Sequence, residues 1–192
     1  NPAAGLDRIK YEKRIKQPLS DEEREVLRCA CEQKRDLALI ELLYSTGMRV
    51  GELVRLNRQD IHFASMDCVV FGKGAKEREV YLNGSSCHHL KAYLLTRNDN
   101  NPALFVSCKA PYLRLTEHGV WQLLRRLGDR AGVPNVHPHR YRHTTLTNAL
   151  NRGMPVQEVQ LLAGHEDINT TMIYCTVAAD NVRSSHRKYL SA

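Results

Sequence analysis

The sequence predicts a mainly α-helical domain of the α+β class, with one small three-stranded antiparallel sheet. Apolar residues recur at helical spacing between Ser20 and Leu56 and again after Ser85. Between these regions lie short stretches of β-branched and aromatic residues, separated by polar and glycine-rich turns. The 192 residues, 42% of them hydrophobic, are enough for one compact core, because a chain of this length buries roughly 70% of its unfolded surface.

The first part of the chain predicts three helices. Ser20–Glu23 has the S-x-x-E form of a capping box, so a helix is expected to begin there. The stretch Leu37–Tyr44 is almost entirely apolar, which predicts a buried second helix that ends at Gly47. A third, short helix is expected after Gly51, through Leu53–Leu56.

The middle of the chain predicts the sheet. Its three strands are expected at Ile61–Phe63, Cys68–Phe71 and Arg78–Leu82, joined by turns at Ser65–Asp67 and Gly72–Lys76. Together they are expected to form a small antiparallel sheet with glycine-rich turns.

From Ser85 to the end, the pattern again predicts helices. The clearest is Glu117–Ala131, whose apolar residues recur at helical spacing. Breaks are expected at Asn98–Pro102, Gly132–Pro134, Gly153–Pro155 and Gly164.

Composition narrows the class of function. Lys and Arg number 28 against 21 Asp and Glu, a net charge of +7, which favours a polyanionic partner although charge alone does not identify one. There is no apolar stretch of about 18 residues and no signal-like leader, which predicts a soluble intracellular protein without membrane spans. The six cysteines have no framework spacing and are expected to be reduced. No structural metal is expected, since the candidate pairs Cys29-x-Cys31, His88–His89 and His137-x-His139 lack the spacing of zinc ligands.

Two motifs in the first half carry candidate chemistry. Arg49 follows the Gly47 bend, and Glu52 lies one helical turn on, where a carboxylate can hold a guanidinium; a plain surface ion pair is the alternative. Gly72–Arg78 is a basic hairpin whose glycines let the backbone approach a phosphate closely. It lacks P-loop spacing and a solvated turn is its alternative, but a lysine on such a turn can donate a proton.

A third motif is His137–Thr144. If its helix begins near Pro138, His139 and Arg142 project from one face close to the helix N-terminus, where an anion is favoured. A helix cap with one exposed arginine is the alternative.

The fourth motif is Leu161–His165, followed nine residues later by Tyr174. A lone tyrosine in such a stretch is normally a core residue. Together, however, the four motifs supply two arginines, a lysine, two histidines and a tyrosine, a set able to transfer a phosphoryl group without a metal.

In this order the motifs resemble the catalytic domain of the tyrosine recombinases, of the phage integrase and Xer type, over nearly the whole chain. Tyr141 departs from the pattern, because the family usually has an aliphatic residue there. The matching residues are Arg49 in TGMRVGEL, Lys73 in GKGAKERE, His139 and Arg142 in HRYRHT, His165 in LLAGH, and Tyr174 in TTMIYCTVA.

The resemblance implies a role for each matching residue. Tyr174 would attack a DNA phosphodiester and form a 3′-phosphotyrosine, with no metal, ATP or other cofactor. Arg49, Arg142 and His165 would stabilise the transition state. Lys73 would protonate the leaving 5′-oxygen and His139 would assist proton transfer at the tyrosine, while Glu52 and His143 would support this set from behind.

The resemblance also implies partners and domains. The partner would be double-stranded DNA, bound as a homotetramer on synapsed sites, with the isolated chain a monomer in the cytoplasm, associated with the nucleoid. Residues 1–16 would be a linker from a missing N-terminal DNA-binding region, 17–177 the catalytic domain and 178–192 a C-terminal tail segment. Contacts to the DNA backbone are expected from Lys76, Arg78, Arg125, Arg126 and Arg130.

Two other functions stay open at this point. A type IB topoisomerase uses similar chemistry but relaxes supercoils without exchanging strands. A non-catalytic DNA-binding module is also possible, because Pro155–Tyr174 has a helix-turn-helix pattern. Covalent attachment through Tyr174 would separate an enzyme from a mere binder.

Overall fold

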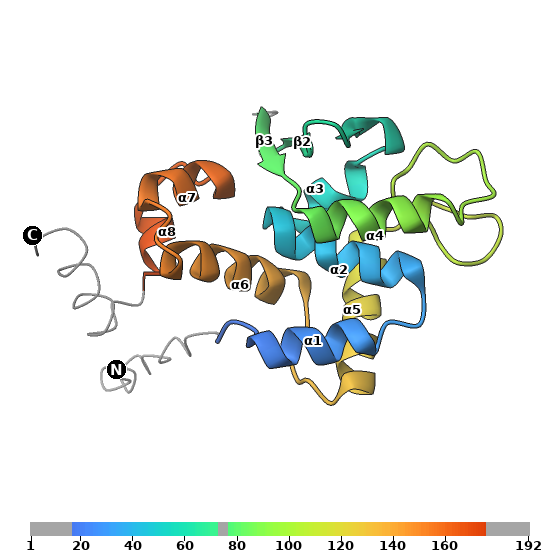
Figure 1. Ribbon diagram of the computed structural model, residues 1–192, viewed down its shortest axis with the longest axis horizontal. Helices are drawn as coiled ribbons and strands as arrows, with labels where there is room; N and C mark the ends of the chain where they lie inside the picture. Colours follow the sequence, from blue (N-terminus) through green and yellow to red (C-terminus); the bar gives the residue numbers. More distant parts are fainter. Residues whose placement is uncertain (1–16, 73–76, 176–192) are drawn as a thin grey trace, which may run out of the picture.

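The computed structural model describes residues 17–72 and 77–175. It confirms the predicted class, with helices dominating and a three-stranded antiparallel sheet inserted between α3 and α4 (Figure 1). The predicted linker 1–16 and tail 178–192 lie outside the described residues. The elements are α1 (Asp21–Cys29), α2 (Lys34–Thr46), α3 (Val50–Arg55), the 3-10 turn η1 (Arg58–Asp60), β1 (Ile61–His62), β2 (Asp67–Phe71), β3 (Glu77–Tyr81), α4 (Gly84–Leu94), α5 (Glu117–Ala131), α6 (Pro138–Asn151), α7 (Val156–Ala163) and α8 (Asn169–Met172).

Local sequence explains the first three helices. The predicted capping box forms at α1, where the Ser20 hydroxyl accepts from the Glu23 amide and the Glu23 carboxylate accepts from the Ser20 amide. Helix α2 begins at Lys34, before the apolar stretch, and is buried along most of its length. It ends as predicted at Gly47, whose φ of +60° is a left-handed conformation that glycine adopts without strain.

The sheet has the order β1-β2-β3, and both pairings are antiparallel. Cys68, Val70 and Val80 are buried on the face that meets the helices. On β3 the side chains alternate, so Arg78 lies on the same face as Val80. The predicted turn Gly72–Lys76 lies, except for Gly72, outside the described residues.

Helix α2 is the centre of the domain. It packs against α4, α6 and β3, while α7 packs against α6, α8 and β3, so that α7 and α8 form one end of the molecule (Figure 1). Most buried apolar residues belong to one core around α2. A second, small core lies beneath α7 and is formed by Leu146, Val159, Ala163 and Tyr174.

One expectation from the sequence is wrong. Beyond the break at Asn98–Pro102 the chain was expected to be helical, but residues 95–116 have an irregular backbone between α4 and α5. Arg97 explains how this backbone is satisfied, because its buried guanidinium donates to the carbonyls of Asn101, Ala103 and Leu104 while it pairs with Asp99. The other helices after Ser85 and their breaks agree with the prediction, and α5 has the predicted bounds.

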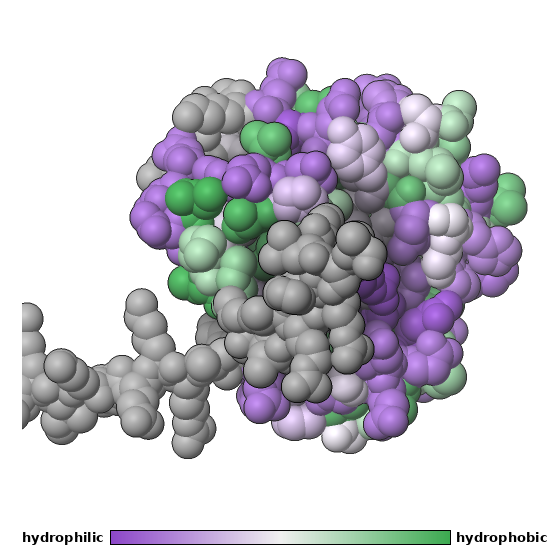
Figure 2. All heavy atoms as spheres, turned by 60° about the vertical axis from the view of Figure 1, so that its left-hand side comes forward, coloured by the Kyte–Doolittle hydropathy of each residue, from purple (hydrophilic) through white to green (hydrophobic). Residues whose placement is uncertain are grey.

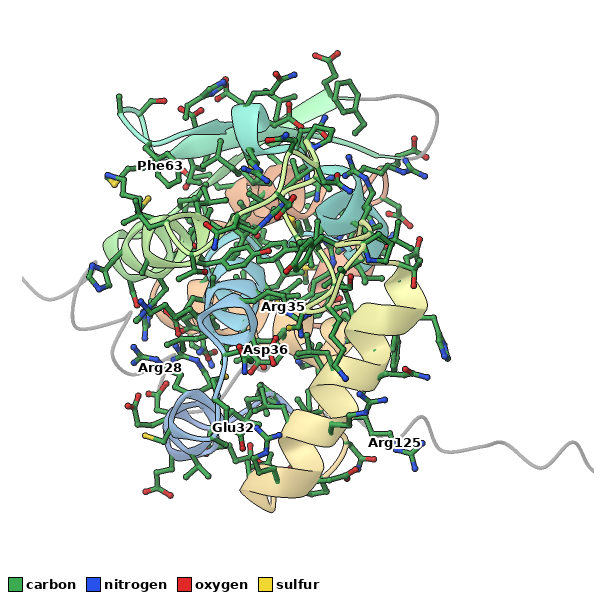
Figure 3. All side chains as sticks on the ribbon, turned by 90° about the vertical axis from the view of Figure 1, so that its right-hand side faces the viewer. Arg28, Glu32, Arg35, Asp36, Phe63 and Arg125 are labelled. Atoms are coloured by element: carbon green, nitrogen blue, oxygen red, sulfur yellow. The ribbon has the colours of Figure 1, made fainter. Side chains whose placement is uncertain are left out.

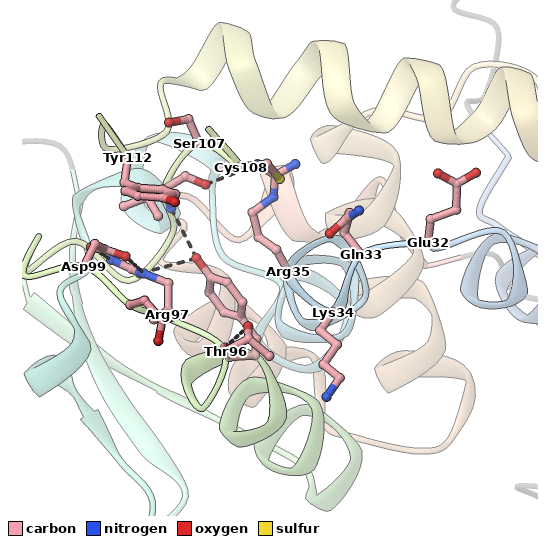
Figure 4. A pocket seen from close by; sticks show the side chains of 13 residues that line it. Glu32, Gln33, Lys34, Arg35, Thr96, Arg97, Asp99, Ser107, Cys108 and Tyr112 are labelled. Atoms are coloured by element: carbon pink, nitrogen blue, oxygen red, sulfur yellow. Dashed lines mark hydrogen bonds and ion pairs between the residues drawn. The ribbon is translucent and has the colours of Figure 1, made fainter. Parts of the chain in front are cut away.

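A cavity of about 380 Å³ lies between this irregular segment and the start of α2. Figure 4 shows Arg97 and Asp99 side by side at one edge of it, and Arg35 at another. Their charges are already compensated, since Arg97 pairs with Asp99 and Arg35 pairs with Asp36.

The surface carries two further features. Arg125 and Arg126 are exposed on α5, and Arg125 extends away from the rest of the domain (Figure 3). On the end formed by α7 and α8, hydrophobic side chains lie among hydrophilic ones (Figure 2), and Leu161 and Ile173 are the most exposed apolar residues there. None of the helices within 17–72 and 77–175 has the length and apolar character needed to cross a membrane.

Candidate active site

A cleft of about 680 Å³ opens between the sheet and the end formed by α7 and α8. The start of α3, strand β3 and the turn after α7 form its walls, so segments distant in sequence meet there. Its lining residues are Arg49, Gly72, Glu77, Arg78, Gln160, Leu161, Gly164, His165, Glu166, Asp167 and Thr170.

Arg49 is held at the N-terminus of α3. The Glu52 carboxylate accepts the Arg49 amide at 2.7 Å and its guanidinium at 3.2 Å, which caps the helix and orients the side chain at once. A second guanidinium nitrogen of Arg49 donates to the Gly164 carbonyl at 3.1 Å. The side chain is still 42% exposed, so it can receive a ligand from the cleft.

Arg142 approaches the same place from the other side. It lies on α6, 4% exposed, and donates to the carbonyls of Gly47 and Ala163 at 2.7 Å each. Arg49 and Arg142 therefore bind the successive carbonyls of Gly164 and Ala163, which brings their guanidinium groups together at the end of α7. Carbonyls at a helix C-terminus lack intrahelical partners, which is why α2 and α7 present them there.

His165 follows this helix end, and its hydrogen-bond partners fit a neutral imidazole. Its Nε2 lies 3.0 Å from a guanidinium nitrogen of Arg142. Since arginine has only donors, Nε2 accepts, and Nδ1 carries the proton that it donates to the Thr171 hydroxyl at 2.8 Å. Burial, together with the nearby charges of Arg142, Arg49 and Arg78, lowers the pKa of His165 to about 4.

Tyr174 lies beneath the cleft and does not line it. Its side chain is 3% exposed in the small core under α7. The centre of its ring is 6.1 Å from that of His165, in a stacked arrangement, and 5.0 Å from that of His143. The sequence suggested either a core residue or a catalytic one. In the structure Tyr174 is a core residue that also lies beside two histidines of the site, His165 and His143.

The two histidines of α6 lie in different surroundings. The helix begins at Pro138 as predicted, yet His139 is exposed while Arg142 is buried. The ring of His139 lies 6.4 Å from that of His137, which in turn stacks on Trp121. His143, expected only to support the site, is the histidine of α6 whose ring packs edge-on against Tyr174.

Positive charge gathers beneath the cleft. Arg49 and Arg78 both pair with the buried carboxylate of Glu52, and the buried guanidinium of Arg142 adds a further positive charge. Burial lowers the pKa of Arg142 to about 10, with contributions from the charges of Arg49 and Arg78, which leaves it protonated at neutral pH. Burial alone would raise the pKa of the Glu52 carboxyl. The hydrogen bonds and charges of Arg78 and Arg49 outweigh this effect, so the net shift lowers the pKa and the carboxylate is ionised.

The sequence did not predict the roles that two residues, Arg78 and Thr171, have in this site. Arg78 was expected to contact the DNA backbone, but its side chain is only 12% exposed and binds Glu52. The alternation along β3, which places it on the face of Val80, is the signal that could have shown this. Thr171, the fully buried partner of His165, had no signal that singled it out.

The remaining predicted residues lie away from the cleft or outside the described part of the chain. Lys73 and Lys76 are in the undescribed turn. Arg125 and Arg126 do not line the cleft, and Arg130 donates to the Ala30 carbonyl and pairs with Glu32. Among residues 17–72 and 77–175, no three His, Cys, Asp or Glu side chains cluster as metal ligands would.

Known proteins are similar to this chain in sequence and in fold. The chain matches the phage integrase family over residues 11–181. It is 41% identical to the tyrosine recombinase XerC of Herpetosiphon aurantiacus over 152 residues, 76% of this chain and 49% of that protein. It is 38% identical to XerC of Staphylococcus aureus over the full chain and 66% of that protein. The chain therefore spans about half to two thirds of the length of these relatives.

Solved structures agree with the sequence matches. The crystal structure of XerA recombinase superposes with a TM-score of 0.79 and 28% identity, over 98% of this chain and 69% of that one. The Tn1549 transposon integrase in complex with transposon right end DNA shares the fold, with a TM-score of 0.77 and 22% identity, over 92% of this chain and 67% of that one. The fold is that of the tyrosine recombinase catalytic domains. The chain belongs to the phage integrase family.

Proposed function

We propose that this chain is the catalytic part of a site-specific DNA recombinase that cleaves and rejoins strands through a 3′-phosphotyrosine. The convergence of Arg49 and Arg142 on neighbouring carbonyls, with His165 and Tyr174 beside them, is the observation that carries the proposal. The non-bridging oxygens of a phosphodiester gain charge in the transition state. Two guanidinium forks, that of Arg49 in the cleft wall and that of the buried Arg142 behind it, suit this charge.

The reaction uses protons from the chain itself. The Tyr174 oxygen attacks phosphorus, a new O–P bond forms and the bond to the 5′-oxygen breaks. The family resemblance assigns the two proton transfers: His139 takes the tyrosine proton as base, and Lys73 gives a proton to the leaving 5′-oxygen. A 5′-hydroxyl of another strand then reverses these steps, so the bond energy is kept without ATP.

DNA binding must rearrange two contacts seen in the free chain. Arg142 donates to Nε2 of His165, so that nitrogen is unable to donate to phosphate. When a phosphate oxygen replaces Nε2 as the acceptor for Arg142, Nε2 is free to carry the proton and Nδ1 to accept from Thr171. Tyr174 must also leave its small core, since its side chain is 3% exposed.

The partner and assembly follow from the same proposal. The Tn1549 integrase is described in complex with transposon DNA and the XerH recombinase bound to its difH substrate, which supports double-stranded DNA as the partner here. We assign 17–177 as the catalytic domain, 1–16 as the linker from an N-terminal DNA-binding region and 178–192 as the tail. The active assembly is a tetramer on synapsed DNA, the free chain a monomer, and the place of action the nucleoid.

A nicked suicide duplex tests this function, because the short 5′ fragment diffuses away after cleavage and traps the covalent complex. The wild-type chain should form a protein–DNA adduct that survives denaturing electrophoresis, and Tyr174→Phe should form none. Tyr81→Phe is the matched control, since Tyr81 is exposed on β3, and it should react like the wild type. An adduct formed by Tyr174→Phe would reject Tyr174 as the nucleophile.

The topoisomerase alternative differs in outcome. The similarity to named recombinases favours strand exchange. An assay with two plasmid-borne sites should show recombinant products; relaxation of supercoils without any recombinant product would favour the topoisomerase instead.

A further inference from the structure

Arg78 makes a contact set that is unusual for a hairpin arginine. Its two terminal nitrogens donate to the two oxygens of Glu52 at 2.6 and 2.7 Å, and its Nε donates to the Leu162 carbonyl at 3.0 Å. This is the bidentate fork geometry in which arginine binds a carboxylate most strongly. The side chain thereby connects β3, α3 and the end of α7.

Each carboxylate oxygen of Glu52 accepts hydrogen bonds from both Arg78 and Arg49. Oε1 accepts from the guanidinium of each arginine, and Oε2 accepts from the Arg78 guanidinium and the Arg49 amide. Glu52 is 4% exposed, and a buried carboxylate needs both charge compensation and filled acceptor sites. Arg49 faces the cleft and supplies only part of the charge compensation and hydrogen bonds that Glu52 needs. Arg78 supplies the rest, and its two parallel hydrogen bonds fix the plane of the carboxylate that orients Arg49.

The close packing of Arg78 against Gly164 supports the same role. A Cβ built on Gly164 would lie 3.0 Å from Cδ and 3.1 Å from a terminal nitrogen of Arg78, so the side chain passes where only glycine leaves room. The carbonyl of this glycine is the one that Arg49 binds. Arg78 therefore supports both groups, Glu52 and Gly164, that determine where the Arg49 guanidinium lies.

We propose that Arg78 is a positioning residue, which rests on the function proposed above: it holds Glu52 and the end of α7 so that Arg49 meets the scissile phosphate in the correct orientation. It does not itself bind phosphate, because the edge of its guanidinium that would grip an anion is occupied by Glu52. A competing role is possible, because Arg78 lies close in sequence to Lys73: Arg78 would then place Lys73, the general acid. The experiments below distinguish this role from the positioning of Arg49.

Arg78→Lys is the first variant, because lysine keeps the charge but is unable to bind both carboxylate oxygens in a fork. Single-turnover cleavage of the suicide duplex should slow by about 10²-fold, the typical cost of a misplacement near 1 Å, while DNA affinity stays the same. Arg97→Lys is the matched control, since Arg97 is a buried arginine that also binds a carboxylate, Asp99, and lines the separate cavity at the start of α2. It should lower stability without slowing cleavage.

A double-mutant cycle tests the coupling to Arg49. If Arg78 acts through Arg49, the combined Arg49→Ala and Arg78→Lys variant should cleave no more slowly than Arg49→Ala alone. Multiplication of the two losses would overturn the proposal. If Arg78→Lys does not fold, Glu52→Gln replaces it in the same experiment. Glu52→Gln should slow cleavage to a similar extent, and its loss should likewise not add to that of Arg49→Ala.

A duplex with sulfur in place of the bridging 5′-oxygen separates the competing role. A thiolate leaves without protonation, so the sulfur substrate should restore the cleavage rate of a variant that has lost its general acid. Arg78→Lys should still cleave this substrate about 10²-fold more slowly than the wild type does. Restoration to the wild-type rate would overturn the proposal in favour of Lys73 placement. Failure of the wild-type chain to form any adduct would instead reject the proposed function itself.

Discussion

Arg49 and Arg142 are expected to matter equally for cleavage but unequally for stability. Arg142→Ala removes a buried side chain whose bonds to the carbonyls of Gly47 and Ala163 have no replacement. Hydrogen bonds to a charged group contribute about 1.5–3 kcal/mol each. Relief of burial and of repulsion from Arg49 offsets part of this, so we expect a net loss of about 3 kcal/mol. For a domain of this size that lowers Tm by about 6–12 °C.

Arg49→Ala removes a side chain that is 42% exposed, and such pairs contribute only about 0–1 kcal/mol. Its Tm should fall by less than about 4 °C. Both variants should cleave about 10²- to 10³-fold more slowly, the usual cost of losing one fixed donor to a transition state. Thermal unfolding followed by circular dichroism, beside single-turnover cleavage of the suicide duplex, measures both quantities. Equal shifts of Tm in the two variants would show that the buried hydrogen bonds of Arg142 contribute no more stability than the exposed contacts of Arg49.

Three other predictions follow from contacts at the end of α7. Gly164→Ala should lose about 1–2 kcal/mol from left-handed strain and also slow cleavage, because its Cβ meets Arg78; Gly132→Ala, with a φ of +69° and open space, should lose stability alone. Thr171→Val should slow cleavage by removing the hydroxyl partner of His165, and Thr171→Ser should retain the rate. The pKa of His165 is about 4 in the folded chain against 6.5 ordinarily, so the unfolded chain binds more protons between these values and the free energy of unfolding should fall as pH is lowered through them. His165→Gln should flatten this part of the curve in urea unfolding.

Each of these has an outcome that contradicts it. Similar cleavage by Gly164→Ala and Gly132→Ala would show that the contact with Arg78 is irrelevant to the rate. A normal rate in Thr171→Val would show that the Nδ1 hydrogen bond does not orient His165. An unchanged slope between about pH 4 and about pH 6.5 in His165→Gln would assign the pH dependence to other groups.

Local signals were sufficient for most of the fold. The capping box at Ser20, the apolar stretch of α2 with its terminal Gly47 and the spacing within α5 each predict an element that the structure contains. The irregular segment 95–116 was mispredicted because its backbone is satisfied by the side chain of Arg97, a tertiary contact without a local pattern.

The site shows the same division between local and tertiary information. The family resemblance predicted that Arg49, Arg142, His165 and Tyr174 form one site. It did not show that Tyr174 is buried in a small core or that Arg142 donates to His165. Charge alone suggested that Arg78 faces DNA. Its actual partner, Glu52, lies 26 residues away in sequence, and only the folded sheet brings the two together.

The position of the covalent bond to DNA decides whether Tyr174 is the nucleophile. The trapped adduct of the wild-type chain can be digested with protease and nuclease and the modified peptide sequenced by mass spectrometry. We expect a nucleotide joined through its 3′-phosphate to Tyr174, with a free 5′-hydroxyl on the released fragment. A nucleotide on any other side chain, or a linkage through a 5′-phosphate, would contradict this expectation.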